Sequence, residues 1–323
     1  MNIPPGAPHA RILGLGEYRP AGRVSNDDLV ARGVDSDDAW VRARTGIAAR
    51  HLAGPGDSVV SMGVEAAGKA LAAAGLSAAD VDLVVLATCT IRNPIPGGAA
   101  RIASALGAGV SGAVGAFDLN AACGGFCYAL SVAADAVRAG SARRVLLVAS
   151  ERLSDFLDWT DRSTCVLFGD GAAAVVVGPS ETPGIGPVAW GSDGAGAQLV
   201  GVPDGDWAIR MDGPAVFRWA TTQLAGVARR ACELAGVQSA ELAAFVPHQA
   251  NLRIVDGLAK ALQLPDSVVV ARDVVETGNT SAASVPLALS ELIAAGRLPG
   301  DGLALLLAFG AGLTYAAQVV RIP

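Results

Sequence analysis

The chain has 323 residues, with 24 basic and 30 acidic side chains, and 52% of its residues are hydrophobic while 17% are charged. This composition argues against a disordered protein, and a net charge of −6 argues against the basic surface that binds a nucleic-acid backbone. The length predicts two domains, or one fold built from two similar halves.

The N-terminal segment carries Pro4, Pro5 and Pro8 where a secretory signal has its apolar run. The longest apolar run, 303–309, is far shorter than the ~18 residues that indicate a membrane-spanning helix. An odd count of 5 Cys in a chain of this size favours free thiols over disulfides. We therefore expect a cytoplasmic protein that binds neither membrane nor nucleic acid.

Short runs of strand-forming residues alternate with Ala-rich stretches of helical length along the chain, which is typical of an α/β protein with covered, largely parallel sheets. Three local patterns then recur in the same order. They are an Ala-Gly turn before a strand (74–75 and 235–236), a second such turn (139–140 and 295–296), and Phe-Gly-x-Gly (168–171 and 309–312).

The order of these repeats predicts an internal duplication, with an N-terminal half over 1–180 and a C-terminal half over 181–323. An alternative is that such turns are local solutions found in any α/β protein, because glycine readily ends a helix in the left-handed conformation. If the halves are real, ligands bind where the carboxyl ends of their strands face each other.

A predicted strand over 115–119 runs into a Gly-flanked turn that holds Cys123, and a helix follows over 126–140. A thiol at a helix N-terminus meets the positive end of the helix dipole, which favours the thiolate and makes Cys123 a candidate nucleophile. The alternative for any cysteine is a small buried side chain, and we expect that role for Cys89, Cys127, Cys165 and Cys232.

His248 ends a predicted strand and precedes a helix, at the carboxyl edge of the second predicted sheet. Asn279 follows Gly278 in a turn that opens another helix, where an Asn is more often a helix cap than a catalytic group. Its spacing from Cys123 equals that between the Ala-Gly turns at 139 and 295, so the duplication predicts that Asn279 and Cys123 are equivalent positions. With 3 His in the chain, we expect no metal site.

These residues lie in motifs that resemble the β-ketoacyl-acyl-carrier-protein synthase III family of the thiolase fold, over essentially the whole chain. The motifs occur in family order at 40–51, 118–131, 160–176, 211–217, 246–254, 276–289 and 309–315. The resemblance implies a homodimer of five-layered αβαβα subunits. It also implies a decarboxylative Claisen condensation of an acyl-CoA starter with malonyl-acyl-carrier protein, which begins fatty-acid or polyketide chains without a cofactor.

By this resemblance, Cys123 takes the acyl group as a thioester, and His248 and Asn279 stabilise the enolate formed when the malonyl group loses CO2. Preorganised donors at the developing charge suit this step, and neither a metal nor a general base is needed. The backbone N–H groups of Cys123 and Ala311 correspond to the oxyanion hole, although relatives often carry Gly at the second position.

The same resemblance assigns coenzyme A to Trp40 and Arg162, which correspond to a pair that sandwiches the adenine. An indole and a guanidinium form a suitable platform for a purine, whereas the alternative is a half-buried Trp beside a surface Arg. Arg44 corresponds to a position near the phosphates or the pocket wall, and Asn251 to one near the pantetheine.

Three positions depart from the family pattern. Ile95 stands where many relatives carry an aromatic residue that closes the acyl pocket across the dimer, which predicts a branched or longer starter. Arg253 and Lys260 correspond to the carrier-protein docking surface, but Asp256 lowers its positive charge. Glu276 lies within the motif at 276–289, and the sequence does not predict an effect of this residue on substrate specificity.

Other enzymes of the same fold are disfavoured by residue counts. Elongating ketosynthases need a His after His248, and degradative thiolases need a Cys after Cys232; the chain has neither. A starter-loading or acyltransferase enzyme of secondary metabolism stays open, and a silent scaffold subunit is disfavoured because Cys123 is present. A dinucleotide-binding enzyme is disfavoured because the Gly spacing at 14–16 and 169–171 lacks a third Gly.

Overall fold

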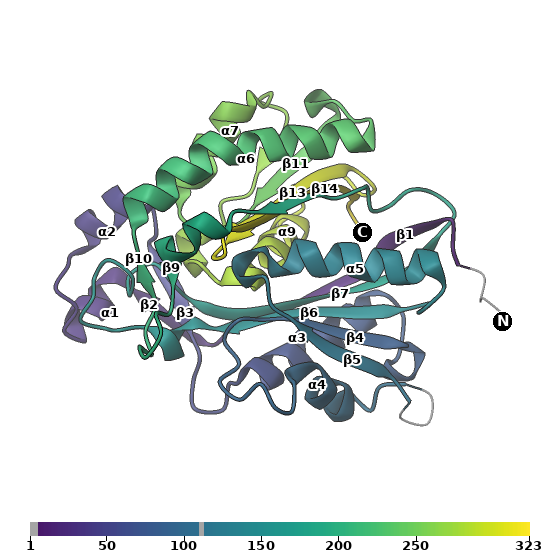
Figure 1. Ribbon diagram of the computed structural model, residues 1–323, viewed down its shortest axis with the longest axis horizontal. Coiled ribbons are helices and arrows are strands. Elements are labelled where there is room, and N and C mark those ends of the chain that lie inside the picture. Colours follow the sequence, from purple (N-terminus) through teal and green to yellow (C-terminus); the bar gives the residue numbers. More distant parts are fainter. Residues whose placement is uncertain (1–5, 110–112) are drawn as a thin grey trace.

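The computed structural model describes residues 6–109 and 113–323, so Pro4 and Pro5 lie outside the described residues. Two mixed sheets, each of 5 strands, alternate with three layers of helices (Figure 1). This arrangement confirms the predicted five-layered α/β fold.

The first sheet has the strand order β1-β7-β6-β4-β5. In that order its strands are His9–Tyr18, Asp170–Ser180, Val145–Arg152, Leu83–Ala87 and Gly115–Leu119. Strand β4 pairs in parallel with β5 and β6, while β7 runs antiparallel to β1 and β6. Strand β5 is therefore one open edge of this sheet.

The second sheet has the order β12-β11-β13-β14-β8. Its strands are Val269–Val270, Leu242–Pro247, Leu303–Gly310, Thr314–Arg321 and Ala189–Ser192. Here β11 pairs in parallel with β12 and β13, and β14 runs antiparallel to β13 and β8. The mixed pairing of the two sheets is alike, which supports the duplication, and the boundary between residues 180 and 181 stays a prediction.

The longer helices form three layers around the two sheets (Figure 1). Helices α3 (Val59–Ala73) and α4 (Gly98–Leu106) cover the outer face of the first sheet, and α6 (Gly213–Ala235) and α7 (Leu252–Leu262) cover the outer face of the second. Helices α5 (Gly125–Ala139) and α9 (Ser284–Ala294) lie between the sheets. Small residues dominate this central layer, which lets both sheets pack closely on it.

The remaining elements lie mainly at one end of the layers (Figure 1). They are β2 (Gly22–Ser25), α1 (Asn26–Ala31), α2 (Asp38–Thr45), β3 (Ala49–Leu52), β9 (Val200–Gly201), β10 (Arg210–Met211) and α8 (Val274–Thr277). Short 3-10 helices span Ala78–Asp80, Ala122–Gly124, Leu153–Phe156, Gly194–Leu199, Ser239–Glu241 and Ser281–Ala283.

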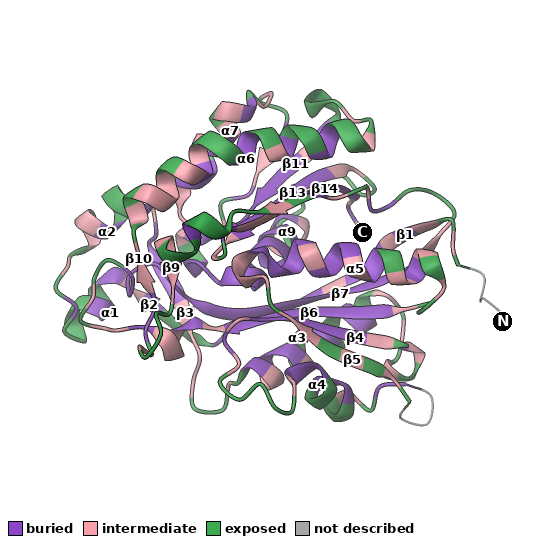
Figure 2. Cartoon of the chain, viewed as in Figure 1, coloured by how far each residue is buried: buried purple, intermediate pink, exposed green. Residues whose placement is uncertain are grey.

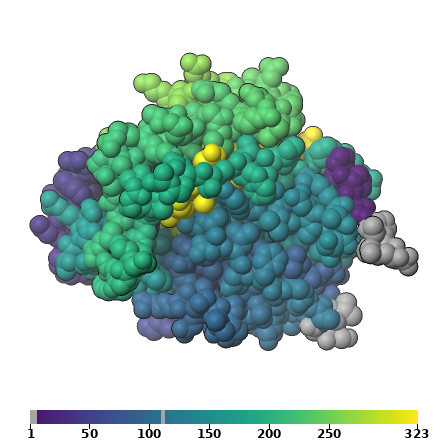
Figure 3. All heavy atoms as spheres, viewed as in Figure 1, coloured from purple at the N-terminus to yellow at the C-terminus, as the bar shows by residue number. Residues whose placement is uncertain are grey.

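Burial follows the layers, since strands β6 and β7 are almost entirely buried, whereas β5 alternates between exposed and intermediate residues (Figure 2). On the surface, the green atoms of the C-terminal half lie above the blue and teal atoms of the N-terminal half (Figure 3). Within the described ranges, no helix has both the length and the apolar character needed to cross a bilayer.

Candidate active site

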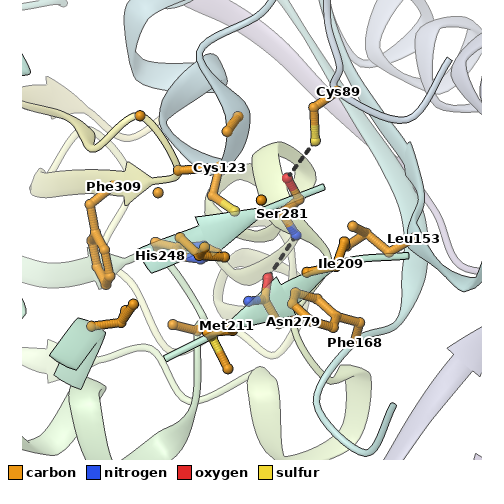
Figure 4. A pocket seen from close by; sticks show the side chains of 18 of the residues that line it. Cys89, Cys123, Leu153, Phe168, Ile209, Met211, His248, Asn279, Ser281 and Phe309 are labelled. Atoms are coloured by element: carbon orange, nitrogen blue, oxygen red, sulfur yellow. Dashed lines mark hydrogen bonds between the residues drawn. The ribbon is translucent and has the colours of Figure 1, made fainter. Parts of the chain in front are cut away.

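A cavity of about 530 Å³ lies where residues from the two halves meet, and its walls are mostly apolar. Its lining includes Cys123 from the N-terminal half and His248 and Asn279 from the C-terminal half. Figure 4 shows these three side chains gathered around one space. The structure thus brings together the three residues that the sequence singled out.

Cys123 lies in the 3-10 turn Ala122–Gly124 that connects β5 to α5, and Ala122 adopts the left-handed conformation with φ of 47°. The end of β13 passes directly against this turn. A Cβ atom at Gly310 would lie 2.7 Å from the Cβ of Cys123 and 2.8 Å from its nitrogen. Only glycine therefore allows β13 to approach the turn so closely.

Burial raises the pKa of the Cys123 thiol to about 12, while the nearby Ser281 side chain acts in the opposite direction. Burial therefore acts against the effect of the helix N-terminus that the sequence predicts for this thiol, because a buried thiolate loses its hydration.

His248 follows β11 and is 2% exposed. Its Nδ1 atom lies 2.6 Å from the Oγ of Ser284, and its ring meets Phe309 edge to face with centroids 5.0 Å apart. Burial lowers the pKa of His248 to about 3, so the imidazole is neutral at physiological pH. A neutral imidazole with Nδ1 occupied offers its Nε2 atom to the cavity.

The backbone of Asn279 is held from both sides by the segment before β7. Its N–H donates to the carbonyl of Leu167 at 2.8 Å, and its carbonyl accepts from the N–H of Gly169 at 3.0 Å. The side-chain Oδ1 accepts the N–H of Ser281 at 2.8 Å, which leaves the amide NH₂ as the free end of the side chain.

The predicted equivalence of Asn279 and Cys123 is wrong. The turn Ala122–Gly124 precedes α5 as the turn Ser281–Ala283 precedes α9, so Cys123 matches Ala282. Asn279 matches Asn120, whose Oδ1 accepts the N–H of Ala122 at 3.0 Å in the same way. Both Asn residues line the cavity, and the error arose because the loops between repeats differ in length.

Ala311 lies in the loop between β13 and β14 and also lines the cavity. Thr314 joins this loop to the Cys123 turn, because its Oγ1 lies 2.9 Å from the carbonyl oxygen of Ala121 and 3.1 Å from that of Ala311. The two segments whose N–H groups were predicted to form an oxyanion hole are thus held against each other.

The four residues predicted to bind coenzyme A divide into two groups. Asn251 lines the cavity and caps α7, since its Oδ1 accepts the N–H of Ile254 at 3.0 Å. Trp40, Arg44 and Arg162 lie outside the cavity lining. The guanidinium of Arg162 is 5.0 Å from the Trp40 ring centroid, and that of Arg44 is 5.7 Å away.

No ring fits between Trp40 and Arg162 at that separation, because two stacked contacts need about 7 Å. Arg162 also donates to the carbonyl of Asp35 at 3.0 Å. An adenine between the two side chains therefore requires Arg162 to swing outward.

Ile95 is 90% exposed and does not line the cavity of its own chain. A second cavity of about 440 Å³ lies beside β5, and it shares Cys89 and Asn120 with the first. Phe117, which is 40% exposed, also lines it. The second cavity is thus a neighbour of the first, at the open edge of the first sheet.

Cys89 was expected to be a packing residue, and that prediction is wrong because its side chain lines the cavity (Figure 4). The other three packing cysteines, Cys127, Cys165 and Cys232, are buried as expected, and all 5 thiols are free. Sequence reasoning also missed Ser281 and Glu151, which contact Cys89. No local sequence signal marks this group, because its members come from three separate segments.

The predicted docking residues Arg253 and Lys260 both lie on α7. The Arg253 guanidinium lies 5.3 Å from the ring centroid of Phe217, the residue before Arg218 on α6. Asp256 forms a 2.9 Å ion pair with Arg272, so it is less available to neutralise the α7 cations. Glu276 forms an exposed 2.6 Å ion pair with Arg23.

Across residues 6–109 and 113–323, no group of three or more His, Cys, Asp and Glu side chains is arranged to hold a metal ion. The cavity offers the thiols of Cys123 and Cys89, the nitrogen donors of His248 and Asn279, and backbone N–H groups. This set suits transfer of an acyl group to sulfur and stabilisation of an oxyanion.

Comparisons with known proteins agree with this chemistry. Two family models match the chain, the 3-oxoacyl-[acyl-carrier-protein (ACP)] synthase III model at residues 117–194 and its C-terminal model at 232–322. The chain is 49% identical to the beta-ketoacyl-[acyl-carrier-protein] synthase III of Streptomyces glaucescens, over 98% of each protein. It is 48% identical to the mycobacterial enzyme of that name from Mycobacterium avium, over 97% of this chain and 95% of the relative.

Solved structures give the same result. The crystal structure of the priming beta-ketosynthase from the R1128 polyketide biosynthetic pathway has a TM-score of 0.96 and 48% identity, covering 100% of this chain and 98% of that one. The 3-oxoacyl-[acyl-carrier-protein] synthase III of Aquifex aeolicus has a TM-score of 0.91 and 40% identity, covering 97% and 99%.

Proposed function

The chain belongs to the 3-oxoacyl-[acyl-carrier-protein] synthase III family of thiolase-fold enzymes, and from this premise we propose that it begins fatty-acid or polyketide chains. The reaction condenses an acyl-CoA starter with malonyl-acyl-carrier protein and releases CO2. The observation that carries the proposal is the convergence of Cys123, His248 and Asn279 on one cavity.

In the first step, the sulfur of Cys123 forms a bond to the acyl carbonyl carbon, and the bond from that carbon to the coenzyme A sulfur breaks. The thiol proton passes to the departing sulfur. The N–H groups of Cys123 and Ala311 donate to the carbonyl oxygen as it becomes negative.

In the second step, the thioester oxygen of the malonyl group accepts hydrogen bonds from the Nε2 of His248 and the Nδ2 of Asn279. Loss of CO2 leaves a negative charge on that oxygen, and neutral donors in a buried site stabilise it strongly. The enolate carbon then attacks the acyl carbonyl carbon on Cys123. The carbon–sulfur bond breaks, and the Cys123 sulfur takes up a proton.

Substrate binding follows from the same family assignment. Trp40 and Arg162 hold the adenine after Arg162 swings outward, Arg44 contacts the phosphates, and Asn251 contacts the pantetheine. Arg253 and Lys260 on α7 meet the acidic carrier protein. The pairing of Asp256 with Arg272 supports this docking, because it leaves the two cations with less competition.

We also propose that the enzyme is a homodimer joined at the β5 edges of two subunits. Three features support this arrangement, namely the open edge of the first sheet, the exposed Phe117 and the second cavity beside it. The 90% exposed Ile95 of each protomer then reaches the acyl pocket of the other. An unpaired strand edge with exposed apolar residues is otherwise a site of aggregation.

The two half-reactions test the proposed function separately. We expect intact-protein mass spectrometry to show one acyl group on the wild-type protein after mixing with acyl-CoAs from acetyl to branched and medium-chain, and none on Cys123→Ala. We expect the acylated protein to release CO2 from malonyl-acyl-carrier protein. Failure of every starter to label the wild-type protein would overturn the proposal.

A further inference from the structure

Glu151 is a carboxylic acid in the wall of the active site for which the proposed reaction has no use. It lies near the end of β6 and is fully buried. Its two oxygens accept from the hydroxyls of Thr88, Thr90 and Ser281, at 3.0, 2.6 and 2.9 Å. They also accept from the N–H of Cys89 at 3.1 Å and from its thiol at 3.4 Å.

The direction of these hydrogen bonds is determined by the backbone. The Oγ1 of Thr88 accepts the N–H of Thr90 at 3.2 Å, and the Oγ1 of Thr90 accepts the N–H of Arg152 at 2.9 Å. The proton of each hydroxyl is therefore free to point at Glu151. Every group around the carboxyl is a donor, and Glu151 accepts from all of them; burial raises its pKa, while these donors act in the opposite direction.

Ser281 connects this carboxylate to the catalytic Asn279. Its hydroxyl donates to Glu151. Its backbone N–H donates to the Oδ1 of Asn279 at 2.8 Å, as Figure 4 shows. Ser281 has a φ of 50°, which is strained for a residue with a side chain. The hydrogen bond to Glu151 holds the side chain of Ser281 in place. The left-handed backbone of Ser281 then directs its N–H toward the Oδ1 of Asn279.

We propose that Glu151 is a positioning residue for decarboxylation, acting through Ser281 to hold the Asn279 amide with its NH₂ group toward the malonyl thioester. The inference rests on the proposed function. Glu151 and Ser281 are 130 positions apart and belong to opposite halves of the molecule. The carboxylate thus aligns a donor from the C-terminal half with Cys123 from the N-terminal half.

The test measures CO2 release from malonyl-acyl-carrier protein by acylated wild-type, Glu151→Gln, Ser281→Ala and doubly substituted enzymes. Glutamine keeps the shape of glutamate, but it replaces one acceptor oxygen with an NH₂ donor. That NH₂ group would face the hydroxyl and N–H donors that surround Glu151. We expect each single substitution to lower kcat for decarboxylation by about tenfold or more. The loss should be smaller than the factor of about 10² to 10³ that follows when a donor to the developing charge is removed outright. KM for the malonyl substrate should stay within about twofold.

The double variant should be no slower than the slower single variant, because residues that act through one contact are not additive. Ser150→Ala is the matched control, since it removes a buried hydroxyl of β6 that bonds instead to the carbonyl of Val59. It should leave decarboxylation unchanged. Thermal melting of each variant shows whether it is folded. If Glu151→Gln does not fold, Ser281→Ala still tests the contact between these two residues.

Additive losses in the double variant, or wild-type decarboxylation in both single variants, would overturn the role of Glu151. Equal losses in acyl-enzyme formation and decarboxylation would also overturn it, since Asn279 serves only the second step. These outcomes differ from failure of the proposed function, in which the wild-type enzyme itself forms no acyl-enzyme.

Discussion

The Nδ1 of His248 lies 2.6 Å from the Oγ of Ser284, and the same Oγ accepts the N–H of Gln249 at 3.3 Å. Because the proposed decarboxylation needs a proton on Nε2 of His248, we expect the serine hydroxyl to donate its proton to Nδ1. The imidazole then carries its own proton on Nε2. Ser284 therefore selects the tautomer that donates to the malonyl thioester.

Ser284→Ala should slow decarboxylation several-fold while acyl-enzyme formation proceeds at the wild-type rate. Without the hydroxyl, the ring is free to carry its proton on Nδ1, where it does not face the substrate. Nitrogen NMR of the histidine distinguishes the two tautomers directly. A ring that keeps its proton on Nε2 in the variant would contradict the role given to Ser284.

Alkylation of Cys123 by iodoacetamide should accelerate roughly tenfold per pH unit from pH 6 to 9. The thiolate is the reactive form, and a pKa raised to about 12 by burial means that its fraction grows throughout this range. Reaction of the other thiols is subtracted with Cys123→Ala, and labelling is located by peptide mass spectrometry. A rate that levels off near pH 7 would show that the thiol ionises more easily than its burial indicates.

Gly310→Ala should abolish acyl-enzyme formation, because the new methyl group would lie 2.7 Å from the Cβ of Cys123. Either the Cys123 turn or the loop that carries Ala311 must move, and loss of one oxyanion donor costs about 10² to 10³ in rate. Gly194→Ala is the matched control, since no atom lies within 4 Å of its added Cβ. The measurement is the initial rate of acylation by acetyl-CoA or a branched acyl-CoA.

Trp40→Ala should raise KM for acyl-CoA by about five- to a hundredfold, which corresponds to the ~1 to 3 kcal/mol of a stacked base. Acylation from an acyl-pantetheine, which lacks the adenine, should be unchanged. Trp190→Ala removes another partly exposed indole, which lies on β8 and is 49% exposed. This control should leave acylation unchanged with both acyl donors. Equal losses with both donors would place Trp40 in the structural core instead of the adenine site.

Phe117→Glu should convert the dimer to monomers, because it puts a charge on each of the β5 edges that we propose to meet. Sedimentation velocity at several concentrations measures the change. Leu234→Glu on α6 introduces the same charge at another partly exposed apolar residue and should leave the dimer intact. A wild-type protein that sediments as a monomer would exclude the proposed assembly.

The sequence was sufficient to find Cys123, His248 and Asn279, because each lies in a short turn that leads into a helix. Such turns are recognisable from glycines, polar residues and strand patterns within about ten positions. The alternation of strands and helices predicted the layered fold for the same reason. The predicted equivalence of Cys123 with Asn279 was wrong because counting residues between repeats ignores differences in loop length. The matching hydrogen bonds of Asn120 and Asn279 identify the equivalent positions without such a count.

Glu151, Ser281 and Cys89 could not be found in this way. A buried glutamate at the end of a strand carries no local signal of its role, since its donors belong to the ends of β4 and the turn before α9. Likewise, burial raised the pKa of Cys123 in a direction that its place before a helix did not predict.

The sequence by itself thus determined the layered fold and the three residues with which the proposed chemistry is done, because backbone propensities and turn chemistry act over short distances. The tertiary structure decided how those residues are oriented, which of their protons are available and what surrounds them. Those properties depend on contacts that only folding creates, such as His248 with Ser284, 36 positions away, and Glu151 with Ser281, 130 positions away.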